Sequence, residues 1–157
     1  MPHVATYVQL ARRSEQTLAD SLRTVGEGHA QQADIFHACQ TLAKMSDSHI
    51  ALLAPIGDRY SRSSGDDDVE EPERLHAAGL AEVRSGQIGL LRDLQDLHLL
   101  ATLVQTTWTV LIQGAQGLRD RELLATATAC NAETSRQLSW LNTRMKGAAP
   151  QALIVAP

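Results

Sequence analysis

The first predicted helix carries an apolar stripe with one acid in its middle. Between residues 4 and 25, side chains at alternating spacings of three and four residues would share one helix face. These side chains are Val4, Val8, Ala11, Glu15, Leu18, Leu22 and Val25. An unpaired carboxylate on a buried face costs several kcal/mol, so Glu15 needs a metal, a cation, a proton or hydrogen-bond donors. The fold must therefore bring one of these partners into its core.

The composition favours helices over sheets. Of the 157 residues, 43% are hydrophobic and only 3% are aromatic, and the abundant alanine and leucine are strong helix formers. The length is typical of a single domain with a sizeable core. The net charge of -4, together with the lack of a basic stripe, argues against a nucleic-acid partner.

Four periodic segments predict four long helices. We expect these helices at about residues 4–25, 30–60, 87–116 and 121–146. Pro55 lies inside the second segment, where it is a candidate for a kink or an early end. Helices of this length and spacing favour an all-α bundle.

The third and fourth segments have the clearest helix signals. The third carries a regular apolar seam that begins at Leu90 and includes Trp108, with spacings of three and four residues. Asp120 is a candidate N-cap of the fourth helix. Gly147 is expected to end that helix, and Pro150 to prevent its continuation.

The lengths of the connections predict the topology. Short turns join the first helix to the second and the third to the fourth, whereas residues 59–86 form a long, acidic connection. Helices joined by short turns pack antiparallel, and a long connection can cross the whole bundle. We therefore expect one domain at residues 1–146, a four-helix bundle with a crossover between helices two and three. The apolar residues 147–157 would form a C-terminal tail that docks on its own bundle or on a partner.

This arrangement resembles the ferritin-like superfamily, which includes the rubrerythrins and bacterioferritins. In that family a carboxylate on helix one and a Glu-x-x-His pair on helix two form half of a di-iron site, and helices three and four supply the other half. In this sequence Glu15 matches the first carboxylate, and His49 matches the histidine of the second-helix motif. Ser46 stands where the glutamate of that motif belongs.

The other half of the motif is also incomplete. On the fourth helix Glu133 matches the glutamate, and Arg136 replaces the histidine. The expected position on the third helix, 31 residues before Glu133, holds Thr102 in place of a carboxylate, with His98 one turn earlier. The resemblance therefore implies a degenerate di-iron motif.

Three interpretations of Glu15 remain open. In the first, the core is metal-free, and the Arg136 guanidinium compensates Glu15 and Glu133. In the second, Glu15, His49, Glu133 and His98 form a single-metal or irregular site for iron or manganese. In the third there is no special site, and Arg136 pairs with Glu133 on the surface.

The sequence contains no complete catalytic motif, so we do not expect an enzyme. We interpret the chain as a ferritin-like bundle protein with a metal-free core and a structural, ligand-binding or interaction role. It would act as a homodimer, with the tail as a contact for a protein partner. The alternative is a metal-binding or redox protein with a reduced ligand set.

The expected location is cytoplasmic. No stretch approaches the ~20 apolar residues that span a bilayer, so no membrane partner is expected. The first residues also lack the pattern of a signal peptide. Cys39 and Cys130 lie far apart in the sequence, and we expect both to be reduced core residues.

Overall fold

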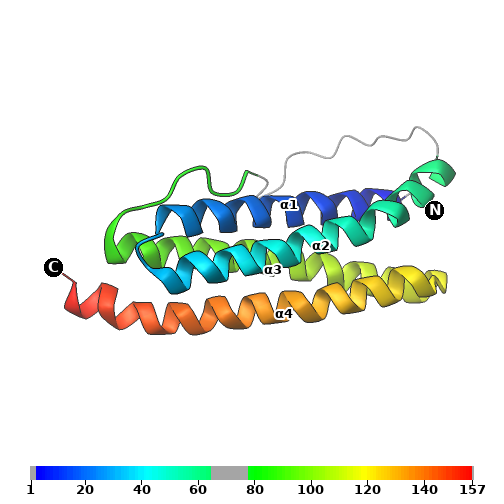
Figure 1. Cartoon of the computed structure of the whole chain (residues 1–157). Helices are drawn as coiled ribbons and strands as arrows, with labels where there is room; N and C mark the ends of the chain where they lie inside the picture. The colour runs from blue at the N-terminus through cyan, green and yellow to red at the C-terminus, as the bar shows by residue number, and fades with distance from the viewer. Residues whose placement is uncertain (1–2, 65–77, 157) are drawn as a thin grey trace.

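The chain folds into four long helices. The computed structural model describes residues 3–64 and 78–156. Its helices are α1 (Val4–Gly28), α2 (Ala33–Ser64), α3 (Gly86–Leu118) and α4 (Arg121–Pro150), and a π-helical turn, η1 (Gln151–Val155), follows α4. The predicted all-α four-helix bundle is confirmed (Figure 1).

The helices form two antiparallel hairpins, α1–α2 and α3–α4. Helices α2 and α3 run in the same direction (Figure 1). Helix α1 packs against both α2 and α3, and α4 packs against α3 and α2. The connection between α2 and α3 therefore joins opposite ends of the bundle, as predicted. Most of its acidic run lies at residues 65–77, outside the described residues.

The core lies along the predicted apolar faces. Every position of the α3 seam from Leu90 to Ala115 is buried, and Trp108 is fully enclosed. The α1 stripe is buried from Val8 to Val25, and this stretch includes Glu15. Among the described helices, none has the apolar length needed to cross a membrane.

Two helices run further than the sequence predicted. Pro55 lies inside α2, which continues to Ser64, so the connection starts later than residue 59. Proline lacks a backbone N–H, and Pro55 lies on an exposed face, where the carbonyl that loses its partner can reach water.

The C-terminal tail that was predicted from residue 147 is helical as far as Val155. Gly147 and Pro150 do not end α4, contrary to the prediction. The helix continues through Pro150 and is followed directly by the π-helical turn η1. Ala148 and Ala152 are buried, and η1 contacts both α3 and α4. These small residues seat the last turns on the bundle.

The segment before α3 is tied to α1. The Leu80 N–H donates to Ser21 Oγ at 3.0 Å. Gly79 has a φ of +68°, and a Cβ there would lie 2.6 Å from the same oxygen, so only glycine fits without strain. These contacts hold residues 79 and 80 against the side of α1.

Two glycine-to-alanine substitutions in α3 test this packing, and we expect them to change the free energy of unfolding in opposite directions. A Cβ on Gly89 would lie 2.6 Å from the backbone carbon of Arg84, so Gly89→Ala should lower the free energy of unfolding by about 1–3 kcal/mol. A Cβ on Gly114 would meet nothing within 4 Å, so Gly114→Ala should raise it by up to ~1 kcal/mol. Urea denaturation measures both values. A stabilising Gly89→Ala substitution would contradict the close approach of the segment to α3.

Candidate functional site

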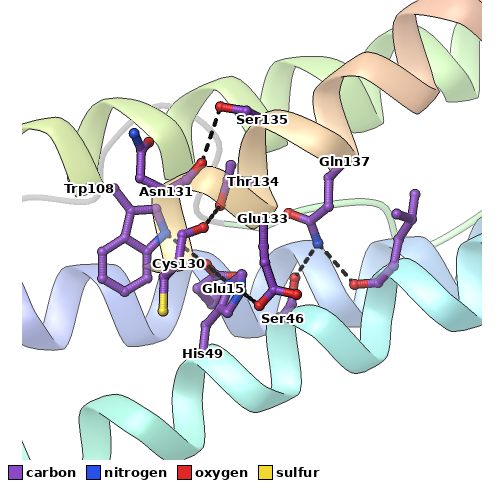
Figure 2. A network of polar contacts seen from close by, with 11 residues as sticks. Glu15, Ser46, His49, Trp108, Cys130, Asn131, Glu133, Thr134, Ser135 and Gln137 are labelled. Atoms are coloured by element: carbon purple, nitrogen blue, oxygen red, sulfur yellow. Dashed lines mark hydrogen bonds and ion pairs between the residues drawn. The ribbon is translucent and has the colours of Figure 1, made fainter. Parts of the chain in front are cut away.

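Glu15 lies in the middle of the bundle with donors from two other helices. The residue is fully buried. Its Oε1 accepts a hydrogen bond from His49 Nδ1 on α2 at 2.8 Å and one from Trp108 Nε1 on α3 at 3.0 Å (Figure 2). These two donors provide part of the hydrogen bonding that a buried carboxylate needs.

The imidazole of His49 bridges two carboxylates. Its Nδ1 faces Glu15 Oε1, and its Nε2 lies 3.0 Å from Glu133 Oε1 on α4. The ring also meets the Trp108 ring edge-on, with centroids 6.0 Å apart. Each of the four helices therefore contributes one residue to the group, which we call the core quartet: Glu15, His49, Trp108 and Glu133.

The geometry favours a charged imidazolium. A histidine donates from both ring nitrogens only when it is protonated, and both nitrogens here face acceptors. Burial alone would lower the pKa of His49. The hydrogen bond and charge of Glu15, and then those of Glu133, outweigh burial and raise the pKa above its ordinary 6.5. His49 thus supplies the positive charge between the two acids.

One oxygen of the core quartet is left without a donor. Glu15 Oε2 is buried and has no hydrogen-bond partner among the described residues. Buried polar atoms are normally paired, and each exception weakens the fold or provides room for a further interaction. The quartet is closed on the Glu15 side, whereas Glu133 has a side chain that is 36% exposed.

A neutral polar layer borders the core quartet. Gln137 Nε2 donates to the Leu42 carbonyl at 2.9 Å and to Ser46 Oγ at 3.0 Å. Ser46 stands at the position where the glutamate of the second-helix motif belongs. Its hydroxyl oxygen accepts the hydrogen bond from the Gln137 amide. Thr134 is also buried, and its hydroxyl donates to the Cys130 carbonyl. These neutral side chains fill the level where the family motif would have charged ligands.

The two cysteines are separate, buried thiols, and both are free. Burial raises the pKa of Cys130 to about 12, with a smaller contribution from the charges of Glu15 and Glu133. Burial and the charge of Asp34 raise the pKa of Cys39 to about 12 as well. Neither thiol is therefore ionised at neutral pH, and thiolate chemistry is disfavoured.

The structure brings three of the predicted site residues together and leaves two apart. Glu15, His49 and Glu133 form one connected group. His98 is half-buried on α3, and none of its described contacts reaches that group; its backbone carbonyl accepts from the Thr102 hydroxyl.

The predicted role of Arg136 in the core requires correction. Its side chain is exposed, and among the described residues it makes no hydrogen bond or ion pair. The next residue on α4, Gln137, is the one that faces inward. One step along a helix turns the side chain by about 100°, so Glu133 and Gln137 share the buried face and Arg136 leaves it. His49, on α2, takes the compensating role instead.

Two hydrogen-bonding residues of the site were not predicted from the sequence. Trp108 was expected in the core, but its hydrogen bond to Glu15 was not foreseen. A buried indole N–H needs an acceptor, and Glu15 and Glu133 were both expected in the core, so a signal was present. The amide of Gln137 gave no comparable signal, because a lone glutamine next to an expected ligand pair is not distinctive.

Comparison with known proteins does not extend these observations. No protein-family model matches the sequence, and neither curated proteins nor solved structures show significant similarity to it. The four-helix architecture is established by the structure alone, and membership of the ferritin-like superfamily stays a prediction.

The residues present do not fit a di-iron centre. Within residues 3–64 and 78–156, no group of three or more His, Cys, Asp or Glu side chains is placed to ligate a metal ion. In the core quartet, His49 uses both ring nitrogens to donate to carboxylates. A histidine ligand must instead offer a nitrogen lone pair to the metal.

The charge on His49 predicts a pH-dependent stability. Because its pKa is raised in the folded state, the protonated ring stabilises the fold fully below the unfolded pKa of 6.5. This contribution is lost as pH rises through the raised folded pKa. We therefore expect the difference in free energy of unfolding between wild type and His49→Gln to shrink as pH rises above 6.5. Urea denaturation across this pH range measures it.

His98→Gln is the matched control for this series. The His98 side chain makes no described contact with Glu15 or Glu133, so this variant should not reproduce the pH course of His49→Gln. A His49→Gln difference that stays constant with pH would contradict a charged imidazolium in the core.

Proposed function

We propose that the chain is a ferritin-like bundle protein with a degenerate, metal-free core site, and that it has a structural, ligand-binding or interaction role. The observation that carries this proposal is the position of His49 between Glu15 and Glu133. The imidazolium supplies there the charge that a metal ion supplies in a carboxylate site. A core balanced in this way needs no cofactor to fold.

The chemistry of the core quartet supports a role other than catalysis. Glu15 and His49 are fully buried, so a substrate could reach only the Glu133 side. The nearby thiol of Cys130 stays protonated at neutral pH, since its pKa is raised to about 12. Hydrogen-bonded charges inside a helix bundle fix the arrangement of the helices more readily than they turn over a substrate.

A metal-binding or redox protein with a reduced ligand set is the second candidate, and the geometry on the Glu133 side favours it. Glu133 Oε1 lies 3.0 Å from His49 Nε2, about the spacing of two adjacent ligands that each bind one ion at ~2.1 Å. Glu15, on the other nitrogen, would then orient the ring. Iron or manganese would have to displace the proton that His49 shares with Glu133.

Metal loading separates the two candidates. The purified protein is incubated with iron(II), manganese(II) or zinc(II), desalted, and examined by elemental analysis beside His49→Gln. For the metal-free protein we expect far less than one ion per chain and an unchanged thermal midpoint, because an ion that binds the native state would raise the midpoint. One ion per chain that is lost in His49→Gln would overturn the proposal, and a further loss in His98→Gln would add His98 as a ligand.

We further propose that the protein is a homodimer that uses the C-terminal turn. Ala152 anchors η1 on the bundle, whereas Leu153, Ile154 and Val155 are 67%, 80% and 66% exposed. Three adjacent exposed aliphatic side chains on an ordered turn are typical of an interaction surface. A second copy of the chain is the partner that is always present at equal concentration.

Sedimentation velocity tests this dimer. Wild type should sediment as a dimer, and the double variant Leu153→Ser/Ile154→Ser should sediment as a monomer with an unchanged helical circular dichroism spectrum. Leu52→Ser is the matched control, since Leu52 is also exposed (49%) but lies on α2. A monomeric wild type, or a dimer that persists in the double variant, would refute the role of η1.

A further inference from the structure

Three exposed aliphatic side chains follow one line along the outer face of α3. Ile88, Leu99 and Val110 are 47%, 47% and 46% exposed. Each is 11 residues from the next, and 11 residues make three turns at about 3.67 residues per turn, so the line runs almost parallel to the helix axis. The buried seam from Leu90 to Ala115 lies on the opposite side of α3. This set of three residues, which we call the α3 outer line, therefore faces away from the core of the bundle.

The α3 outer line differs from the other exposed surfaces of the bundle. Outside η1, the other large hydrophobic side chains that are exposed in the described part of the chain are Tyr7 on α1 and Leu52 on α2. The outer line also crosses an uncharged stretch, because residues 97–118 contain no Asp, Glu, Lys or Arg in a chain that is 20% charged. Single exposed aliphatic residues are ordinary, whereas an aliphatic line on an uncharged helix face is typical of an interaction surface.

The C-terminal turn η1 extends this surface at one end. It contacts α3, and the C-terminus lies at the same end of the bundle as the start of α3, where Ile88 is (Figure 1). The exposed side chains of Leu153, Ile154 and Val155 are therefore at the Ile88 end. The uncharged stretch, residues 97–118, leads to the opposite end of α3. One side of the molecule thus has an aliphatic turn at one end and an uncharged surface at the other.

The spacing of the α3 outer line is symmetric about Leu99. An antiparallel copy of α3, related by a twofold axis at Leu99, places Leu99 beside the partner's Leu99. It also places Ile88 beside the partner's Val110, and Val110 beside the partner's Ile88. The same axis brings η1 to the uncharged end of the partner's α3, and it does so twice, as an isologous interface requires.

The charge of Arg92 favours the antiparallel direction over the parallel one. Arg92 is exposed and lies one turn after Ile88, on the same face of α3. In a parallel pair the two copies of Arg92 would lie side by side, and like charges repel at an interface. In the antiparallel pair Arg92 faces the partner's Thr106, which belongs to the uncharged stretch.

The size of the surface is that of a stable dimer interface. Helix α3 has 33 residues, and at about 1.5 Å per residue it is ~50 Å long. A strip of this length and of the width of one helix, about 12 Å, covers roughly 600 Å² on each copy. The exposed side chains of η1 extend this area toward the ~800 Å² per partner that a standard interface buries.

We propose that a second copy of the chain docks on the α3 outer line in antiparallel orientation, with the twofold axis at Leu99 and with η1 on the uncharged end of the partner's α3. This inference rests on the homodimer proposed above, and it names the surface that receives η1. Burial of the aliphatic side chains drives the association, and no charge of residues 97–118 has to be desolvated. Because the interface pairs a surface with itself, the assembly closes at two copies.

Opposite charges at Leu99 test the position of the axis. In Leu99→Glu two carboxylates meet across the axis and repel, and in Leu99→Lys two ammonium groups do the same. In sedimentation velocity we expect each variant to have a dimer Kd at least about tenfold weaker than wild type. An equimolar mixture of the two variants should restore the dimer, because opposite charges then meet. Leu52→Glu is the matched control, since Leu52 on α2 is 49% exposed, and its Kd should not change.

Cross-linking tests the direction of the two helices. Ile88→Cys and Val110→Cys are mixed and treated with a short bismaleimide. Cys39 and Cys130 do not compete for the reagent, because both are buried and burial raises the pKa of each thiol to about 12. We expect covalent dimers in the mixture and far fewer in either variant alone. Covalent dimers of Ile88→Cys alone, with none added by mixing, would contradict the antiparallel pairing.

The outcomes distinguish this inference from the homodimer on which it rests. A monomeric wild type would overturn both. A dimer that is lost in Leu153→Ser/Ile154→Ser but unchanged in Leu99→Glu would overturn the α3 surface and leave the homodimer intact. A dimer that is weakened in both charge variants but not restored in their mixture would overturn the twofold axis at Leu99.

Discussion

The hydrogen bonds that hold the Glu15 carboxylate organise the rest of this bundle. An acid at 0% exposure is tolerated only where donors and a compensating charge meet it, and here they come from α2 and α3. The apolar seams alone would stabilise many relative positions of four helices. The charge on Glu15 is satisfied in one of them, since Trp108 and His49 must both reach the same oxygen. Polar contacts of this kind add specificity where hydrophobic packing adds stability.

Much of the architecture could be predicted because it follows from local periodicity. The α1 stripe and the α3 seam are buried as expected, and Glu15, His49 and Glu133 meet because each lies on a predicted inner face. Arg136 could not be placed in the same way. Whether the third or the fourth residue after Glu133 points inward depends on the centre of the buried face, which packing between helices determines. The contact between Trp108 and Glu15 spans 93 residues, so the periodicity of each helix placed both residues in the core but did not pair them.

The two acids that are buried among the described residues, Glu15 and Asp93, have different hydrogen bonding. Asp93 has every oxygen paired, whereas Glu15 keeps one oxygen without a described partner. Asp93 carried the same sequence signal as Glu15, since it stands three residues after Leu90 and next to Leu94 on the α3 seam. An acid on an apolar helix face is therefore a useful guide to structure in this chain, even where no family motif includes it.

The core quartet also divides between the two hairpins. Glu15 and His49 belong to α1–α2, and Trp108 and Glu133 belong to α3–α4. The bond from His49 to Glu15 can form within the first hairpin, whereas the bonds from Trp108 to Glu15 and from His49 to Glu133 form only when the hairpins dock. These two bonds select the correct alignment of one hairpin on the other. They do not depend on which molecule supplies the second hairpin, so a dimer that exchanges α3–α4 between copies would keep both of them.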